Sequence, residues 1–193
     1  PDLTVDGSFA TGGAATVVLI LAGVPAPLAL LIAVLAGVLA GLITGLLHTV
    51  FGIPGILAGI LTQISLWSVN LLVLSGANKA VNVDKYNLIV SLRNIGSAIV
   101  TTLVLMAVLI AVLYWYFGTE QGSAIRSTGC NPQMSKAQGI NINVMKVLAL
   151  SLSNGLVALS GGLMAQYQGF ADIKMGQGAI VIGLAAVIIG EVL

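Results

Sequence analysis

Hydrophobic and polar positions alternate in long blocks along this chain. No Asp, Glu, Lys or Arg occurs between Asp6 and Lys79. Proline and glycine divide this run into two long apolar segments, residues 28–50 and 54–76. Each can form a membrane-spanning helix, because about 20 helical residues cross the hydrocarbon core of a bilayer.

Three further apolar segments follow. Residues 95–117 end in the cluster Tyr114-Trp115-Tyr116-Phe117, which suits a membrane interface, and residues 144–166 form another full span. The segment at residues 179–193 is too short to cross alone and is still apolar at the last residue. Because the chain also opens without Met, we expect residues 1–193 to be a single transmembrane domain cut at both ends from a longer protein.

The first apolar segment, residues 10–24, differs from the others. Its uninterrupted part begins after Gly12-Gly13 and is followed by Pro25 and Pro27. We expect a broken or re-entrant helix here, and broken helices at membrane depth occur where they face protein or a water-filled path. This favours a transport route. The alternative is a kinked span whose first half lies upstream.

Composition supports the membrane assignment. Hydrophobic residues make up 58% and charged residues 7% of the 193 residues, with a mean hydropathy of +1.10, whereas about 25% of residues in soluble domains are charged. The net charge of +1 gives no basic surface for nucleic acid. The single cysteine, Cys130, allows neither an internal disulfide nor a thiolate metal cage.

Side chains that could carry chemistry are sparse. The sequence has no nucleophile with a plausible base, no cluster at metal-ligand spacing and no Gly-rich phosphate loop. His48 is expected to be an interfacial side chain rather than a metal ligand or proton relay. A proton-driven carrier usually has a chain of buried acids or histidines within its spans, and Glu191 is the one candidate acid here. The sequence therefore supports a proton-driven carrier only weakly. We expect no enzyme activity, no metal and no cofactor bound by this chain.

Small and polar residues recur within the spans. Gly37, Gly41 and Gly45 are four residues apart, which predicts a face where another helix approaches closely, and Gly55 and Gly59 begin a similar face. Two interpretations stay open for the polar residues: they line a polar path, or they make hydrogen bonds between helices. The polar residues concerned are Gln63 and Asn70 on nearly one helical face, and Ser151, Ser153, Asn154, Ser160 and Gln166 in the later span.

The loop at residues 120–143 is more polar than its neighbours and is predicted to be structured. A short helix is expected from Pro132 to Gln138, with Asn131 as its cap and Gly139 ending it in a left-handed turn. Loops should alternate sides, with residues 77–94 and 169–178 on one face and residues 118–143 on the other. Charge does not decide the orientation, because positive residues occur on both sides: Lys79, Lys85, Arg93 and Lys174 on one, Arg126, Lys136 and Lys146 on the other.

Several motifs stand out along the chain. They are PDLTVDGSFATGGAA at the start, Arg126-Ser127-Thr128-Gly129, Asn131-Pro132, Met134, Gly139-Ile140-Asn141 and Lys146 in the loop, then SLSNGLVALSGGLMAQYQG and GQGAIVIGLAAVIIGE. These motifs resemble those of the transmembrane permease subunits of bacterial ABC importers, in the group that serves branched-chain amino acids and ribose. The likeness covers nearly the whole chain and is strongest to tryptophan/tyrosine-type permeases.

The resemblance implies a cytoplasmic coupling helix in the 120–143 loop that docks on an ATPase subunit. The residues implied in this coupling are Arg126, Asn131, Pro132, Met134, Ser135, Gly139, Ile140 and Asn141. Ser135 stands where the group tends to have Ala and keeps the small size, whereas Cys130 stands where an acid is frequent. The resemblance also implies which residues lie near the translocation path, namely Thr4, Asp6, Gly7 and Ser8. Gln63 and Asn70 are further candidates for lining this path.

We therefore expect an all-α polytopic membrane protein, a bundle of transmembrane helices with one broken segment and a cytoplasmic coupling helix. Its expected role is the permease subunit of an ATP-driven importer in the bacterial inner membrane. The expected solute is a small molecule, an amino acid, and the resemblance favours an aromatic one. Expected partners are cytoplasmic ATP-binding subunits that use the ATP, a second permease copy and an extracytoplasmic binding protein. The rival interpretations are a secondary carrier or channel without an ATPase, and a purely structural membrane subunit.

Overall fold

The computed structural model describes residues 2–82, 86, 88–90 and 95–192, with the side chains of residues 191 and 192 excepted. Lys85, Arg93 and the Glu191 side chain lie outside this part. The elements run in the order α1 (Val5–Leu21), α2 (Ala26–Thr49), α3 (Gly55–Leu74), β1 (Asn78–Ala80), α4 (Ile95–Phe117), α5 (Glu120–Cys130), α6 (Pro132–Ala137), α7 (Ile142–Gln168), β2 (Phe170–Asp172) and α8 (Ala179–Val192).

Within the described residues, four helices are long and apolar enough to cross a membrane: α2, α3, α4 and α7. The two strands have three residues each, so the architecture is the predicted all-α membrane bundle. The apolar runs form helices because a segment in lipid must satisfy its backbone hydrogen bonds internally. Each of the four helices overlaps one of the full spans expected from the sequence.

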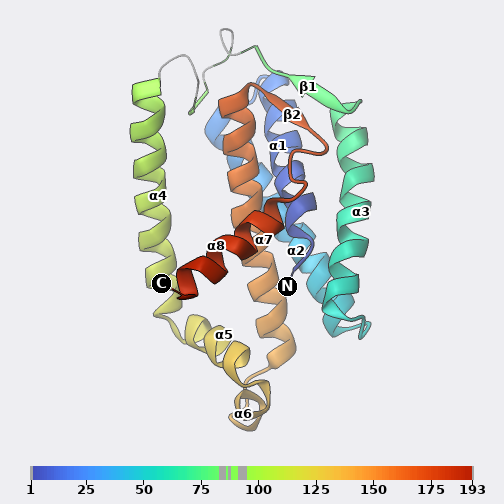
Figure 1. The fold of residues 1–193 in the computed structure, drawn as a ribbon, viewed down its shortest axis with the longest axis vertical. Coiled ribbons are helices and arrows are strands. Elements are labelled where there is room, and N and C mark those ends of the chain that lie inside the picture. Colours follow the sequence, from blue (N-terminus) through green and yellow to red (C-terminus); the bar gives the residue numbers. More distant parts are fainter. Residues whose placement is uncertain (1, 83–85, 87, 91–94, 193) are drawn as a thin grey trace.

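The two ends of the bundle carry different structures (Figure 1). At one end β1 pairs antiparallel with β2, so that Lys79 lies opposite Ala171. The short helices α5 and α6 lie at the other end. The predicted alternation of loops is therefore confirmed for the described parts of these loops, since β1 and β2 share one end and the α5–α6 segment is at the opposite one.

Helix α1 is one continuous helix of 17 residues, so the expected boundary of the short segment at Gly12-Gly13 is wrong, whereas its end before Pro25 and Pro27 is where the sequence places it. The helix tolerates this glycine pair because its bare backbone packs closely: a Cβ added at Gly12 would overlap the backbone of Ala158, and one at Gly13 would lie 2.6 Å from the Met175 sulfur. A turn that includes Gly23, at φ +88°, then leads into α2. The α1 helix is too short to cross a bilayer alone.

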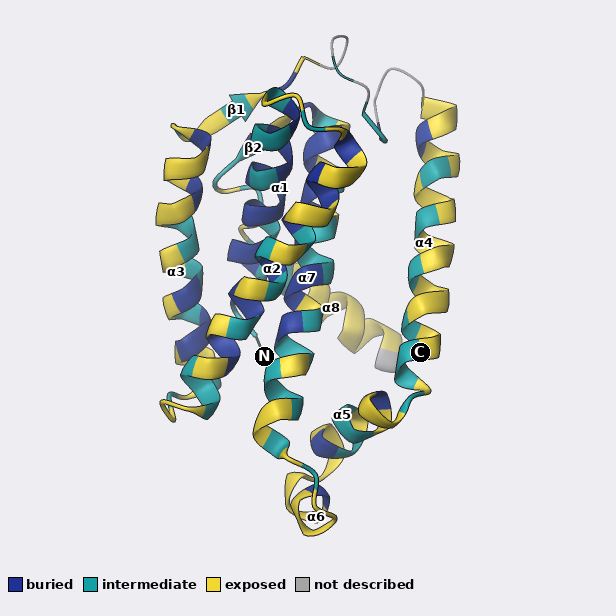
Figure 2. Cartoon of the chain, turned by 180° about the vertical axis from the view of Figure 1, so that it is seen from behind, coloured by how far each residue is buried: buried dark blue, intermediate teal, exposed yellow. Residues whose placement is uncertain are grey.

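The centre of the bundle is formed by α1, which packs against α2, α3 and α7. The hydrophobic core gathers around its second half, toward the strand end, where Val17 and Ile20 meet Ala29 of α2 and Ala165 of α7. Figure 2 shows these buried surfaces between the helices. Helix α4 differs: it stands apart from the others in Figures 1 and 2, and Ala98 is its one buried residue.

Candidate translocation and coupling sites

Three threonine hydroxyls join the N-terminus of α1 to α2 and α3. The Thr4 and Thr44 hydroxyl oxygens are 2.8 Å apart, and Thr44 donates to the Thr62 hydroxyl at 2.9 Å. These side chains are at most 3% exposed. Thr62 in turn donates to the Ala58 carbonyl at 3.0 Å. Because buried hydroxyls need partners, this chain of hydrogen bonds fixes where the three helices meet.

A second polar group joins α1 to α7. The Ser8 hydroxyl donates to Asn154 Oδ1 at 2.6 Å, and Asn154 Nδ2 donates to the Asp2 carboxylate at 2.7 Å. Asp2 also accepts from the Thr4 backbone N–H at 3.0 Å. Ser8 and Asn154 are both fully buried. The network therefore anchors the segment before α1 to the middle of α7.

Asp6 joins α1 to the start of α8. Its two carboxylate oxygens accept from the backbone N–H groups of Gly178, at 3.2 Å, and Ile180, at 3.1 Å. The Asp6 side chain is 8% exposed. A Cβ added at Gly176 would overlap the Asp6 backbone carbonyl, so the loop before α8 lies directly on α1. A carboxylate here caps the α8 helix and complements its dipole.

The predicted glycine face of α2 is confirmed, and its partner is α7. A Cβ at Gly37 would overlap the Asn154 carbonyl, and one at Gly41 would overlap that of Leu150. Gly45 continues the face along the same helix, against Val147. The second face is confirmed only in part: a Cβ at Gly59 would lie 2.9 Å from the Leu3 backbone nitrogen, whereas one at Gly55 would make only ordinary contacts with His48.

Gln63 and Asn70, the candidates on α3, lie in different surroundings. Asn70 is fully buried and its amide atoms have no hydrogen-bond partner among the described residues. Gln63 is half-buried and lies beside α1, since a Cβ at Gly7 would be 3.1 Å from its Cα. Within the described part neither side chain joins the threonine or the Asn154 network, so their role in a polar path stays a prediction.

The α5–α6 segment is held by local caps. The predicted helix at Pro132 is confirmed as α6: Asn131 Oδ1 accepts from the Met134 backbone N–H at 3.1 Å, and Gly139 turns the chain with φ +82°. Ser135 is 1% exposed, and its hydroxyl donates to the Asn131 carbonyl at 3.0 Å. A small residue at position 135 is therefore required by packing.

Other coupling candidates lie at the surface or at helix ends. Arg126 donates from Nη2 to the Phe117 carbonyl at 3.1 Å, which ties α5 to the end of α4. Asn141 caps α7 through the Val144 backbone N–H at 3.3 Å. The Met134 side chain is 59% exposed. Pro132 is exposed and Ile140 half-buried, so α6 presents an uncovered, partly apolar surface at this end of the bundle.

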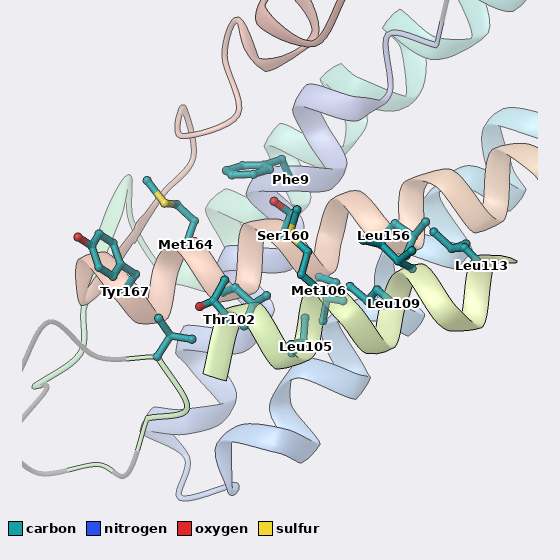
Figure 3. A pocket seen from close by; sticks show the side chains of 14 residues that line it. Phe9, Thr102, Leu105, Met106, Leu109, Leu113, Leu156, Ser160, Met164 and Tyr167 are labelled. Carbon is teal, nitrogen blue, oxygen red and sulfur yellow. The ribbon is translucent and has the colours of Figure 1, made fainter. Parts of the chain in front are cut away.

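Among the cavities lined by described residues, three border the helices of the networks above. One of about 380 Å³ lies toward the α6 end and is lined by Asp2, Thr44, His48 and Lys146 among others. His48 Nδ1 is 2.8 Å from the Ile53 carbonyl, which fixes its ring. A second, of about 330 Å³, lies toward the strand end. The largest, of about 640 Å³, is almost entirely apolar and separates α4 from α7 and Phe9, as Figure 3 shows.

The structure also gives roles to residues outside the predicted sites. Thr44 and Thr62 complete the network of Thr4, and Asp2 completes that of Asn154. One sequence signal could have found the threonines: Thr44 and Thr62 each lie three residues after a close-packing glycine, Gly41 and Gly59, and so on the buried side of their helix. Asp2 has no such signal, because it precedes the helix.

Together, the four apolar helices, the small-residue packing faces and the buried polar contacts between helices define a multi-pass membrane protein. The family model for the permease component of branched-chain amino acid transport systems matches residues 1–192. The chain belongs to this family.

Two curated relatives are similar to the chain. The tyrosine transport system permease protein of Clostridioides difficile (strain R20291) is 39% identical over 159 residues, covering 82% of this chain and 52% of the relative. An uncharacterized protein of Rickettsia prowazekii (strain Madrid E) is 34% identical over 158 residues, covering 82% of this chain and 55% of the relative. The chain thus spans about half the length of these proteins. No solved structure matches it significantly.

Proposed function

We propose that this chain is the core of the permease subunit of an ATP-driven amino acid importer of the bacterial cytoplasmic membrane. An aromatic amino acid is the proposed cargo, supported by the name of the tyrosine transport relative. In this proposal an extracytoplasmic binding protein delivers the cargo, two permease copies form the pathway, and separate cytoplasmic subunits hydrolyse ATP. The chain itself binds no cofactor.

The observation that carries this proposal is the α5–α6 segment. It is a capped, compact unit at one end of the bundle, with the Met134 side chain 59% exposed on α6. An exposed apolar side chain on a rigid helix can insert into a groove of a partner protein. Motion of the partner would then pass through α5 to α4 by way of Arg126, and through Asn141 to α7.

The test of this proposal is a charged residue introduced on α6. Met134→Glu in the full-length permease should abolish both co-purification of the ATPase and ATP-driven tyrosine uptake into vesicles, because a carboxylate would be desolvated in the groove. The matched control is Phe51→Glu, which places the same charge on another apolar side chain, 73% exposed, in the turn between α2 and α3. This control should retain both activities.

The opposite result identifies the rival class. A permease that purifies without any ATPase, and that moves tyrosine across liposomes without ATP, would be a secondary carrier. Retention of the ATPase by Met134→Glu at the level of the parent protein would contradict docking through α6.

A further inference from the structure

The cavity of about 330 Å³ at the strand end is lined by two kinds of side chain. Charged groups come from the end of β2 and the residues that follow it, and Gln168 at the end of α7 adds an amide. Apolar groups come from α1, α7, β2 and Met175. Its volume lies at the lower limit of ordinary small-molecule pockets. A cavity with a few charged groups against an apolar wall suits a small amphipathic ligand.

The charged groups are Asp172 and Lys174, which do not neutralise each other. Asp172 Oδ1 accepts from the Lys174 backbone N–H at 2.7 Å, which fixes the carboxylate. Within the described residues, no ion pair or hydrogen bond occupies the Lys174 ammonium or the second Asp172 oxygen. A fixed carboxylate beside a free ammonium matches the two charges of a zwitterion.

The apolar wall combines two phenyl rings with two thioethers. Phe9 and Phe170 provide the rings, while Met164 and Met175 provide adaptable side chains that favour contact with an aromatic ligand. Phe9 and Met164 also line the larger apolar cavity, as Figure 3 shows. The two cavities therefore share a wall, and a ring that lies on Phe9 borders both.

The segment that carries the charges is held in place at both ends. Before it, the pairing of β2 with β1 fixes Ala171 opposite Lys79. Within it, the Met175 backbone N–H donates to the Asp172 carbonyl at 3.2 Å. After it, Asp6 holds the Gly178 backbone N–H. The cavity is thus preformed, which lowers the entropic cost of binding.

We propose that this cavity binds the zwitterion of an aromatic amino acid at the delivery end of the pathway. Asp172 accepts from the α-ammonium group, Lys174 donates to the α-carboxylate, and the ring lies on Phe9 and Phe170. The choice of an amino acid rests on the proposed function, whereas the charge and ring pattern of the cavity does not depend on it.

The test is calorimetric titration of the purified full-length permease in nanodiscs with L-tyrosine and two analogues that each lack one charge. Lys174→Gln should weaken L-tyrosine binding about tenfold or more, and leave tyramine, which has no carboxylate, unaffected. Asp172→Asn keeps the acceptor for the Lys174 backbone and should weaken L-tyrosine and tyramine but not 3-(4-hydroxyphenyl)propanoate. The matched control, Lys79→Gln in β1, should bind all three like the parent.

Two results separate this proposal from the proposed function. If ATP-driven tyrosine uptake is normal and both cavity variants bind all three compounds like the parent protein, the cavity assignment is wrong and the importer function stands. If the variants show the expected pattern but no amino acid stimulates ATP hydrolysis or ATP-driven uptake, the cavity stands and the importer function fails. Absence of L-tyrosine binding by the parent protein would overturn the cavity assignment.

Discussion

The carboxylate of Asp6 accepts a 3.2 Å hydrogen bond from the backbone N–H of Gly178, 172 positions further along the chain. This contact joins the first turn of α1 to the loop before α8. Since Gly176 also lies against the Asp6 backbone, the start of α8 is positioned by α1 and not by its own sequence. The position of α8 should therefore depend on this one carboxylate.

Replacing Asp6 by Ala should release the start of α8. The variant loses both acceptors and the favourable charge at the helix N-terminus, which together stabilise a helix by about 1 to 2 kcal/mol. Hydrogen–deuterium exchange should show faster exchange at residues 178–182, with little change in α2. Asp6→Asn keeps one acceptor and should be intermediate. Unchanged exchange in Asp6→Ala would contradict the contact.

Ser8 and Asn154 should be energetically coupled. Removing the Ser8 hydroxyl leaves Asn154 Oδ1 without its 2.6 Å partner, and buried hydrogen bonds between membrane helices contribute about 0.6 to 1.7 kcal/mol. A double-mutant cycle with Ser8→Ala and Asn154→Ala, measured by unfolding in mixed detergent, should give a coupling energy of this size. The control pair, Ser8 with the exposed Ser153, should give additive effects. Additivity for Ser8 and Asn154 would refute the bond.

Close packing of α1 against α7 should make Gly161 intolerant of even a methyl group. A Cβ there would overlap the Phe9 backbone carbonyl, so Gly161→Ala forces the helices apart and should cost about 1 to 3 kcal/mol. Gly183→Ala in α8 is the matched control, because nothing lies within 4 Å of its added Cβ. Thermal denaturation in detergent should separate the two. Equal melting temperatures would contradict the contact.

The cap of α6 should be needed for coupling rather than for folding of the bundle. Asn131→Ala removes the acceptor for the Met134 N–H and should destabilise this short helix by about 1 kcal/mol. We expect reduced tyrosine uptake per ATP hydrolysed, with the melting temperature of the bundle unchanged. Asn131→Asp preserves the cap and should restore coupling.

Gly139 adopts a backbone conformation that favours glycine. Its φ of +82° is rarely adopted by residues with a side chain, and Gly139→Val should strain the turn by about 1 to 2 kcal/mol. The expected result is ATP hydrolysis that is uncoupled from uptake in a folded permease. Gly129→Val, an exposed glycine in α5 with open space around it, is the control. Normal coupled uptake by Gly139→Val would contradict this role.

Much of the candidate coupling segment could be predicted because its determinants are local. Asn131, Pro132 and Gly139 are close together in sequence, and each acts on backbone groups within a few residues. The pathway candidates could be predicted less well. Thr4 and Ser8 do lie in buried polar networks, but their partners Thr44 and Asn154 come from other helices, and no local pattern identifies such pairs.

The sequence by itself determined the four membrane-crossing helices and their alternating loops, because the length of an apolar run decides whether a helix can cross a bilayer. It also determined the glycine face of α2, since four-residue spacing places small residues on one side. Only the tertiary structure decided that α1 continues through Gly12-Gly13, that the α2 face meets α7, and that Asp6 holds α8. These features depend on which helices become neighbours, and that is set by packing between segments far apart in sequence.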